Sequence, residues 1–141
     1  MIESRIHLHH VGCLVPAIEE ALDSYRALGY QVTGEPGISV VSQKVRLCFL
    51  SAGSGELIEL VEPAEDNQFL RRLLNKGVTF YHLGFLCSDL GLTLDAMTNT
   101  GGRILTRFSS EAFEGRECVF VLTQLGQMIE LIQAPVRIEP V

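Results

Sequence analysis

The chain repeats itself at about half its length, and this internal repeat constrains its fold more than any other feature. His10 and His82 each begin a His-apolar-Gly pattern followed by strand-forming residues, and they lie 72 positions apart. The stretch around Glu59, Gly-Glu-Leu-Ile-Glu-Leu, returns as Gly-Gln-Met-Ile-Glu-Leu around Glu130, 71 positions later. Such self-similarity at a fixed spacing indicates a tandem duplication of one structural module.

The hydrophobic pattern predicts the elements of each half. A helix pattern opens at Pro16 and ends at Gly29 in the first half, and its counterpart is capped by Ser88 or Asp89 and ends at Gly101. Apolar stretches before and after these helices predict four strands in each half. The strands that follow the helices fall at residues 30–33, 45–50 and 57–61, and at residues 104–108, 118–122 and 128–132.

These elements predict an α+β fold in which tandem βαβββ modules form a curved mixed sheet around a metal-binding cleft. We expect a single domain over residues 1–141, with module one at about 5–63 and module two at about 79–134. The segment 66–77 has apolar residues at helical spacing and is predicted to be a helical linker. Neither half has enough apolar surface to fold alone, so the two halves should share one core.

Charge and composition exclude several classes of function. A net charge of −6, with no basic cluster larger than Arg71–Arg72, argues against a nucleic-acid-binding surface. No apolar run reaches the ~20 residues of a membrane-spanning helix, and Met1–Arg5 has no signal-peptide pattern. We therefore expect a cytoplasmic protein that binds a small molecule, and the sequence leaves open whether it is a homodimer. Scattered cysteines without CxxC spacing predict four buried free thiols, at Cys13, Cys48, Cys87 and Cys118.

Two glutamates occupy unusual positions in the last predicted strand of each half. Glu59 shares a strand face with Leu57 and Val61, while the neighbours on either side of it point to the opposite face. Glu130 has the same placement in the second half. Carboxylates are rarely buried among apolar side chains unless they are paired or bind a metal. The repetition of this placement in both halves argues against chance.

The histidines complete a metal-binding pattern. His10 and His82 each head the first strand of their half, and Gly12 and Gly84, two residues later, would leave the same face uncrowded. Two imidazoles and two carboxylates suit one divalent ion, with Co²⁺, Ni²⁺, Mn²⁺, Zn²⁺ and Fe²⁺ as the candidates. Four protein ligands leave positions open for water or substrate, as a catalytic site requires.

Each of these residues has a simpler interpretation when it is taken alone. A single strand histidine is usually a satisfied core residue, and a single glutamate at a strand end is usually solvated. His7 and His9 fall on the face opposite His10 and are interpreted as non-ligands, although a one-residue change of register would make His9 the candidate. Four arginines are candidate anion contacts, for which solvated surface charge is the simpler interpretation: Arg46, Arg103, Arg107 and Arg116.

At these residues the sequence resembles the vicinal-oxygen-chelate superfamily, which includes glyoxalase I, methylmalonyl-CoA epimerase, extradiol dioxygenases, and fosfomycin- and bleomycin-resistance proteins. The likeness covers nearly the whole chain and is greatest to the epimerases. Two segments differ from the epimerase pattern, residues 42–45 and 122–127, and both shape the substrate pocket in that family. The likeness is carried by His10–Pro16, Glu19–Tyr25, Leu57–Pro63, Phe69–Leu70, Tyr81–Phe85 and Met128–Leu131.

The resemblance implies that the metal ligands are His10, Glu59, His82 and Glu130. It also implies removal of a proton alpha to a thioester carbonyl, with Glu130 as the acid/base group and Glu59 as the second candidate catalytic carboxylate. We therefore expect a metal-dependent epimerase or isomerase, with an acyl-CoA such as methylmalonyl-CoA as the candidate substrate. A lactoylglutathione lyase of the glyoxalase I type and a small-molecule-binding resistance protein remain the alternatives. Extradiol oxygenation is less favoured, because its iron site generally has three protein ligands.

Overall fold

The computed structural model of the protein describes residues 4–135, which contain eight β-strands and three α-helices. The chain divides into two compact units. The first unit is His9–Leu83, and the second unit joins the chain before His9 to the chain from Gly84 onward. The divisions fall inside β1 (Ile6–Leu14) and β5 (Phe80–Cys87), so each unit contains a part of both strands. Residues 1–3 lie outside the described residues. They belong to the segment Met1–Arg5, for which the sequence predicts no signal peptide.

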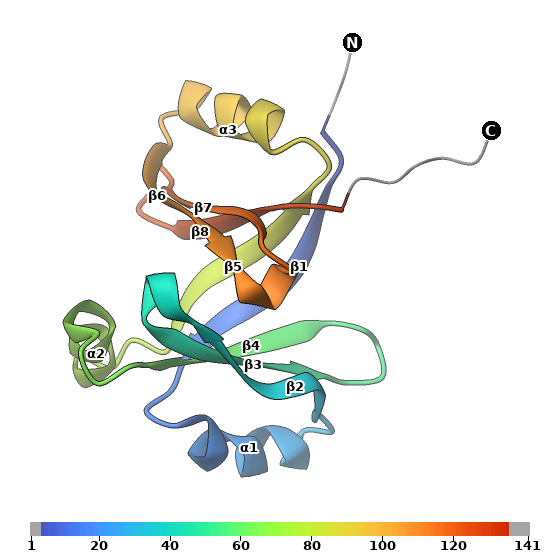
Figure 1. Cartoon of the computed structure of the whole chain (residues 1–141), viewed down its shortest axis with the longest axis vertical. Coiled ribbons are helices and arrows are strands. Elements are labelled where there is room, and N and C mark those ends of the chain that lie inside the picture. Colours follow the sequence, from blue (N-terminus) through green and yellow to red (C-terminus); the bar gives the residue numbers. More distant parts are fainter. Residues whose placement is uncertain (1–3, 136–141) are drawn as a thin grey trace. The chain divides into compact units, whose positions relative to one another are not determined.

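The first unit contains one complete repeat of the predicted order. After β1 come α1 (Ile18–Ala27), β2 (Gln31–Val40), β3 (Val45–Ser51) and β4 (Leu57–Pro63). The strands are hydrogen-bonded in the order β2-β3-β4-β1-β5; β3 is antiparallel to both β2 and β4, and β1 is parallel to β4. Helix α1 covers one face of β2, β3 and β4 (Figure 1). A second helix, α2 (Gln68–Asn75), lies in the predicted linker.

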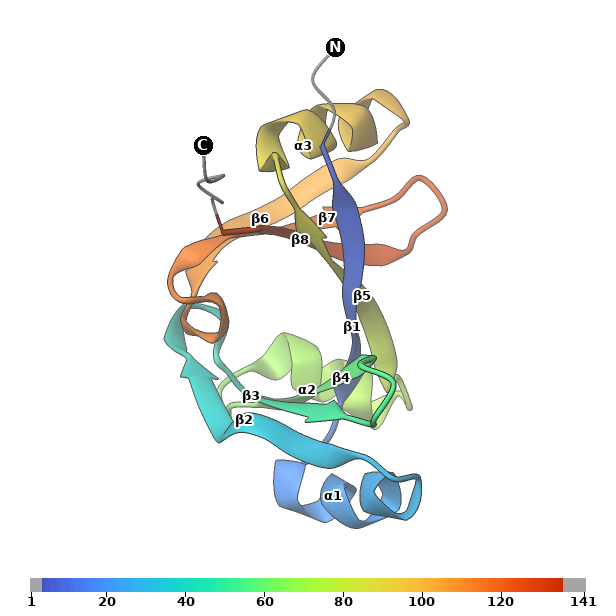
Figure 2. The same cartoon turned by 90° about the vertical axis from the view of Figure 1, so that its right-hand side faces the viewer.

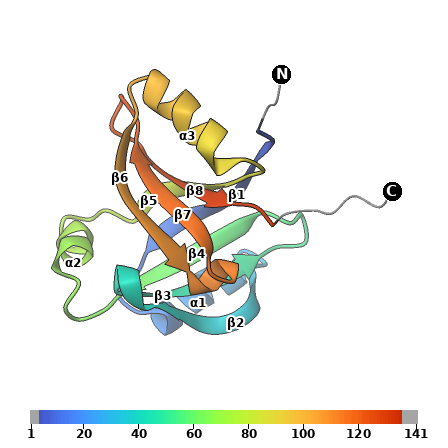
Figure 3. The same cartoon turned by 45° about the horizontal axis from the view of Figure 1, so that its top comes forward.

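The second unit repeats this order. Helix α3 (Leu90–Asn99) follows β5 and is followed by β6 (Arg103–Ser110), β7 (Arg116–Leu122) and β8 (Met128–Gln133). The strands have the order β5-β8-β7-β6. Strand β7 is antiparallel to both β6 and β8, and α3 covers one face of these strands (Figure 3). The predicted α+β class, the tandem βαβββ modules and the mixed sheet are therefore confirmed.

The cores of the two units use corresponding residues of the repeat. Ile58 and Leu60 of β4 pack with Ile18 of α1, and Ile129 and Leu131 of β8 pack with α3. Strand alternation predicted that these residues lie on the strand face opposite Glu59 and Glu130, and on that face they pack against the helices. The same alternation turns Glu59 and Glu130 away from the helices. The four cysteines are buried free thiols, as predicted.

The last strand of each unit also caps the helix of that unit. Ala17 offers no side-chain cap to α1, and the carboxylate of Glu62 instead accepts a hydrogen bond from Ile18 N at 2.8 Å. In the second unit, the Gln133 side chain accepts a hydrogen bond from Leu90 N at 3.0 Å. Glu62 and Gln133 each follow the strand glutamate of their unit by three positions. Each last strand therefore carries one of the predicted metal ligands and also holds the first residue of the helix of its unit.

The structure departs from the predicted elements mainly around the second strand of each repeat. Strand β2 continues to Val40 instead of ending at residue 33, and its pairing with β3 shifts register between Thr33 and Ile38. Short 3₁₀ turns precede β3 and β7 and end in left-handed residues, Lys44 and Glu114. Within residues 4–135, no helix is long and apolar enough to cross a membrane.

Candidate metal centre

Three strands of the first unit bring together three of the four predicted ligands. Strand β1 supplies His10, β4 supplies Glu59 and β5 supplies His82. Strands β1 and β5 lie side by side (Figure 2), and Leu14 N donates a hydrogen bond to Thr79 O at 2.7 Å just before β5 begins. His10, Glu59 and His82 are 1%, 2% and 5% exposed, respectively, so the site excludes most water.

The ligand atoms of these residues converge on one point. Nε2 of His10 lies 2.9 Å from Nε2 of His82, and 3.5 Å from Oε2 of Glu59. Nε2 of His82 lies 3.3 Å from Oε1 of Glu59. All of these atoms lie within 4.8 Å of one another. Two imidazole nitrogens and a carboxylate that face a common point form a natural set of ligands for a divalent ion.

The surroundings of the Glu59 carboxylate indicate whether a cation fits at this position. Its Oε2 atom is buried and has no hydrogen-bond partner in the structure. A buried ionised oxygen without a hydrogen bond costs several kcal/mol unless a positive charge compensates it. A divalent ion between Glu59 and the two histidines would supply that charge, so these three residues fit a metal centre.

Gly12 makes room for one of the ligands. It lies opposite Glu59 in the β1–β4 register. A Cβ atom on Gly12 would lie 2.6 Å from Nε2 of His82, and closer still to other atoms of that ring. The His82 imidazole therefore occupies the space that any other residue at position 12 would fill. This confirms, for Gly12, the prediction that glycine keeps the ligand face uncrowded.

Phe49 forms one wall of the site. It lies opposite Glu59 in the β3–β4 register and is itself buried. Its ring is in edge-to-face contact with His10, at a centroid distance of 5.7 Å, and with His9, at 5.6 Å. Nδ1 of His9 lies 2.8 Å from Nδ1 of His10. The sequence interpretation placed His9 on the opposite face, and alternation gave no signal for this contact.

Glu130 lies in the second unit, where it holds the position that Glu59 holds in the first. It is buried in β8 and is 5% exposed. It lies opposite Phe120 in the β7–β8 register, just as Glu59 lies opposite Phe49 in the β3–β4 register. The predicted equivalence of the two glutamates thus extends to the residue across each strand. That Glu130 shares a metal with the other three residues remains a prediction.

The four candidate arginines lie in ion pairs and on the surface. Arg46 contacts Glu19 at 2.6 Å and Glu62 at 3.3 Å, which ties β3 to the start of α1. Nε of Arg116 donates a hydrogen bond to the Gln133 carbonyl at 2.8 Å. Arg107 pairs with a glutamate on the neighbouring strand, and Arg103 is exposed. These contacts support structural roles rather than anion binding.

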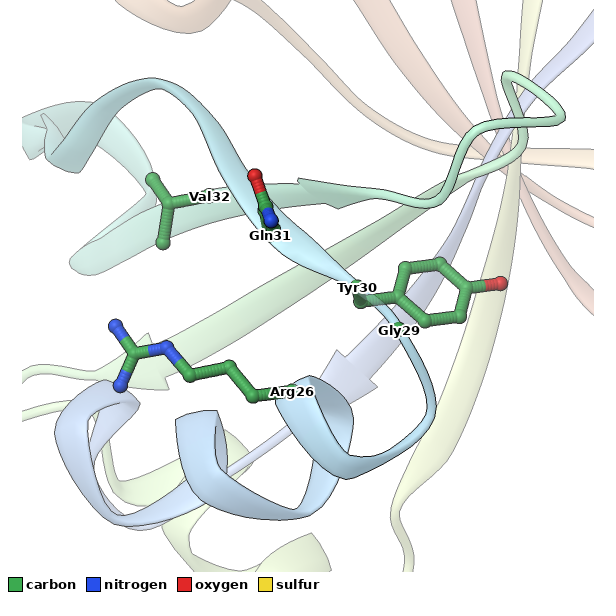
Figure 4. A pocket seen from close by; sticks show the side chains of 5 residues that line it. All are labelled: Arg26, Gly29, Tyr30, Gln31 and Val32. Atoms are coloured by element: carbon green, nitrogen blue, oxygen red, sulfur yellow. The ribbon is translucent and has the colours of Figure 1, made fainter.

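A surface hollow of about 460 Å³ lies between the end of α1 and the start of β2 (Figure 4). Among the described residues that line it, the charged one is Arg26, which pairs with Asp23 at 3.7 Å. None of the three clustered ligands lines it. The hollow is therefore separate from the metal centre. It is lined by Arg26, Gly29, Tyr30, Gln31 and Val32.

Comparison with known proteins gives matches over most of the chain. Residues 9–120 match the family model of the glyoxalase/bleomycin resistance protein/dioxygenase superfamily. The chain is 31% identical to the protein YqjC of Bacillus subtilis (strain 168) over 130 residues, which covers 89% of this chain and 91% of YqjC.

Solved structures give similar matches. The structure of methylmalonyl-CoA epimerase from Mycobacterium tuberculosis has a TM-score of 0.74 at 25% identity, covering 91% of this chain and 88% of the epimerase. Protein BH1468 from Bacillus halodurans C-125 has a TM-score of 0.78 at 20% identity, covering 96% of this chain and 99% of that chain. The second likeness, at its lower identity, supports the fold alone.

Proposed function

Because the chain belongs to the glyoxalase/bleomycin resistance protein/dioxygenase superfamily, we propose that it is a metal-dependent enzyme that removes a proton alpha to a carbonyl group. One observation carries the proposal: His10, Glu59 and His82 are buried together with their ligand atoms facing one point. A structural core would not need this arrangement, because apolar residues of similar volume would pack there at lower cost.

Glu130 is proposed as the fourth ligand and as the acid/base group. The support is its burial and its position opposite Phe120, which matches the position of Glu59 opposite Phe49. With two carboxylates and two neutral imidazoles, the protein ligands would balance the charge of a divalent ion. The candidate ions are Co²⁺, Ni²⁺, Mn²⁺, Zn²⁺ and Fe²⁺.

The bound ion would act as a Lewis acid that polarises the substrate carbonyl and acidifies the alpha proton. The residues of the chain handle the proton. Glu130 accepts it as a general base and returns it as a general acid, and return to the opposite face inverts the alpha carbon. Glu59 is the second candidate catalytic carboxylate. Phe49 shields this centre from water, which strengthens each electrostatic interaction inside it.

The proposed substrate is an acyl thioester, with methylmalonyl-CoA as the first compound to test. The support is the structural likeness to a methylmalonyl-CoA epimerase at 25% identity. Glyoxalase I also removes a proton next to a carbonyl group, in its case from a glutathione hemithioacetal. The two reactions therefore differ in the substrate that the site accepts, and a direct assay with both compounds distinguishes them.

The test measures how fast the alpha proton of an acyl thioester exchanges with D₂O in the presence of the metal-loaded protein. Glu130→Gln keeps an amide oxygen but cannot accept the proton, so exchange should fall by ~10²–10⁴ while much of the metal affinity remains. His10→Ala should lose the metal first and the activity as a consequence. Equal metal loss in both variants would make Glu130 a ligand only, and full exchange in Glu130→Gln would remove it from the mechanism.

The wild-type protein supplies the remaining outcomes. Exchange on an acyl-CoA supports the epimerase proposal. Turnover of the hemithioacetal without exchange on any acyl-CoA would replace it with the lyase reaction. Tight binding of either compound without turnover would identify a sequestering protein instead of an enzyme.

A further inference from the structure

His9 contacts the metal centre without being one of the proposed ligands. It is half-buried in β1, directly before His10. Its Nδ1 lies 2.8 Å from Nδ1 of His10, and the two rings meet edge to face with their centroids 5.1 Å apart. Adjacent residues of a strand point to opposite faces, so strand alternation alone does not predict this contact.

The two nitrogens of His10 have different surroundings. Nε2 faces the centre, 2.9 Å from Nε2 of His82 and 3.5 Å from Oε2 of Glu59. Nδ1 faces His9 instead. A neutral imidazole has one protonated nitrogen and one with a free lone pair. A metal bound by Nε2 needs that lone pair, so the proton of His10 must sit on Nδ1 and needs an acceptor there.

We propose that His9 is a positioning residue whose Nδ1 accepts the hydrogen bond from Nδ1–H of His10. This bond fixes His10 in the tautomer whose Nε2 can bind a divalent ion, and it places the proton of His9 on its own Nε2. The inference rests on the proposed metal-dependent function. An outer-shell acceptor of this kind orients a ligating histidine and raises its basicity.

Phe49 holds the pair of histidines in place. It is 8% exposed and contacts both rings edge to face. Such aromatic packing alone would be satisfied by any ring at position 9. The competing explanation is therefore that His9 only fills space against Phe49. The variants must distinguish the effect of the packed ring from the effect of its acceptor nitrogen.

Two substitutions make this separation. His9→Phe keeps an aromatic ring against Phe49 but removes the acceptor nitrogen. His9→Asn removes the ring but keeps an acceptor oxygen close to the place of Nδ1. His7→Phe is the matched control, because His7 is an exposed histidine of the same strand. The unfolding temperature of each metal-free variant reports any loss of packing.

The first measurement is the affinity for Co²⁺ by calorimetric titration. His9→Phe should bind Co²⁺ ~10–100-fold more weakly than wild type, the range for loss of an outer-shell partner. His9→Asn should stay within a few-fold of wild type, and His7→Phe should match it. Wild-type affinity in His9→Phe, or a loss in His9→Asn as large as in His9→Phe, would overturn the proposal.

The second measurement needs no metal. Long-range ¹H–¹⁵N correlation spectra of the metal-free protein, recorded at about pH 8, identify the tautomer of His10. Wild type should carry the proton on Nδ1, and His9→Phe should lose this preference. A proton on Nε2 of His10 in wild type would overturn the proposal, even if His9→Phe did not fold. Wild type that binds no metal but shows the Nδ1–H tautomer would instead refute the proposed function and leave the hydrogen bond established.

Discussion

Replacement of Gly12 by alanine should disable the metal centre through one added methyl group. Its Cβ would lie 2.6 Å from Nε2 of His82, whereas ordinary contacts begin at 3.4 Å, so the ring would have to move by at least about 0.8 Å. Metal–ligand distances tolerate only ~0.2 Å. Co²⁺ affinity should therefore fall by more than the ~10–100-fold that loss of an outer-shell partner costs. Overpacking should also lower the free energy of unfolding by about 1–3 kcal/mol.

The assay is a calorimetric Co²⁺ titration beside denaturant unfolding of the metal-free protein. Gly53→Ala is the matched control, because a Cβ at Gly53 meets no atom within 4 Å. It should leave both affinity and stability within error of wild type. A Gly12→Ala protein with wild-type Co²⁺ affinity would contradict this prediction, because it would show that the position of the His82 ring does not matter for metal binding.

Three further predictions concern stability. Glu62→Ala should cost about 0.5–2 kcal/mol by removing the acceptor for Ile18 N. Glu62→Gln should cost less, because the Gln133 side chain accepts the equivalent bond from Leu90 N in the second unit, where Asp89 is the N-cap; urea unfolding measures both. Leu60→Ala, at a fully buried position, should cost about 2–5 kcal/mol in the same assay. Burial, and then the hydrogen bond to the Cys13 thiol, raise the pKa of Tyr25 from 10.0 to about 12. The protonated phenol is thus favoured in the folded state, and stability should fall as the pH rises from about 10 to about 12. Tyr25→Phe should flatten this fall, and an equal fall in both proteins would contradict it.

The internal repeat made most of the architecture predictable from sequence. Two copies of one pattern predict the same order of elements twice, so an element that is misassigned in one half can be corrected from the other half. The strand faces of Glu59 and Glu130 followed from alternation alone, because β4 and β8 are regular strands. The repeat predicted that each half offers one histidine and one glutamate to the site, and in the first unit His10 Nε2 lies 3.5 Å from Oε2 of Glu59.

The features that sequence reasoning missed depend on irregular backbone or on distant residues. Strand β2 continues through a register shift after Thr33, which breaks the alternation that reveals a strand. The cap of α1 comes from Glu62, which lies 44 positions away, so local capping rules could not find it. Strand alternation places His9 and His10 on opposite faces of β1, so it could not predict the contact between their Nδ1 atoms.

The metal content of the purified protein tests the central claim most directly. Wild type and His10→Ala are each equilibrated with Co²⁺, Ni²⁺, Mn²⁺ or Zn²⁺, desalted and measured by elemental analysis. The four-ligand site predicts about one ion per chain in wild type and a large loss in a folded His10→Ala protein. Wild type that retains none of the four ions, or His10→Ala that retains as much as wild type, would contradict a metal centre at these residues.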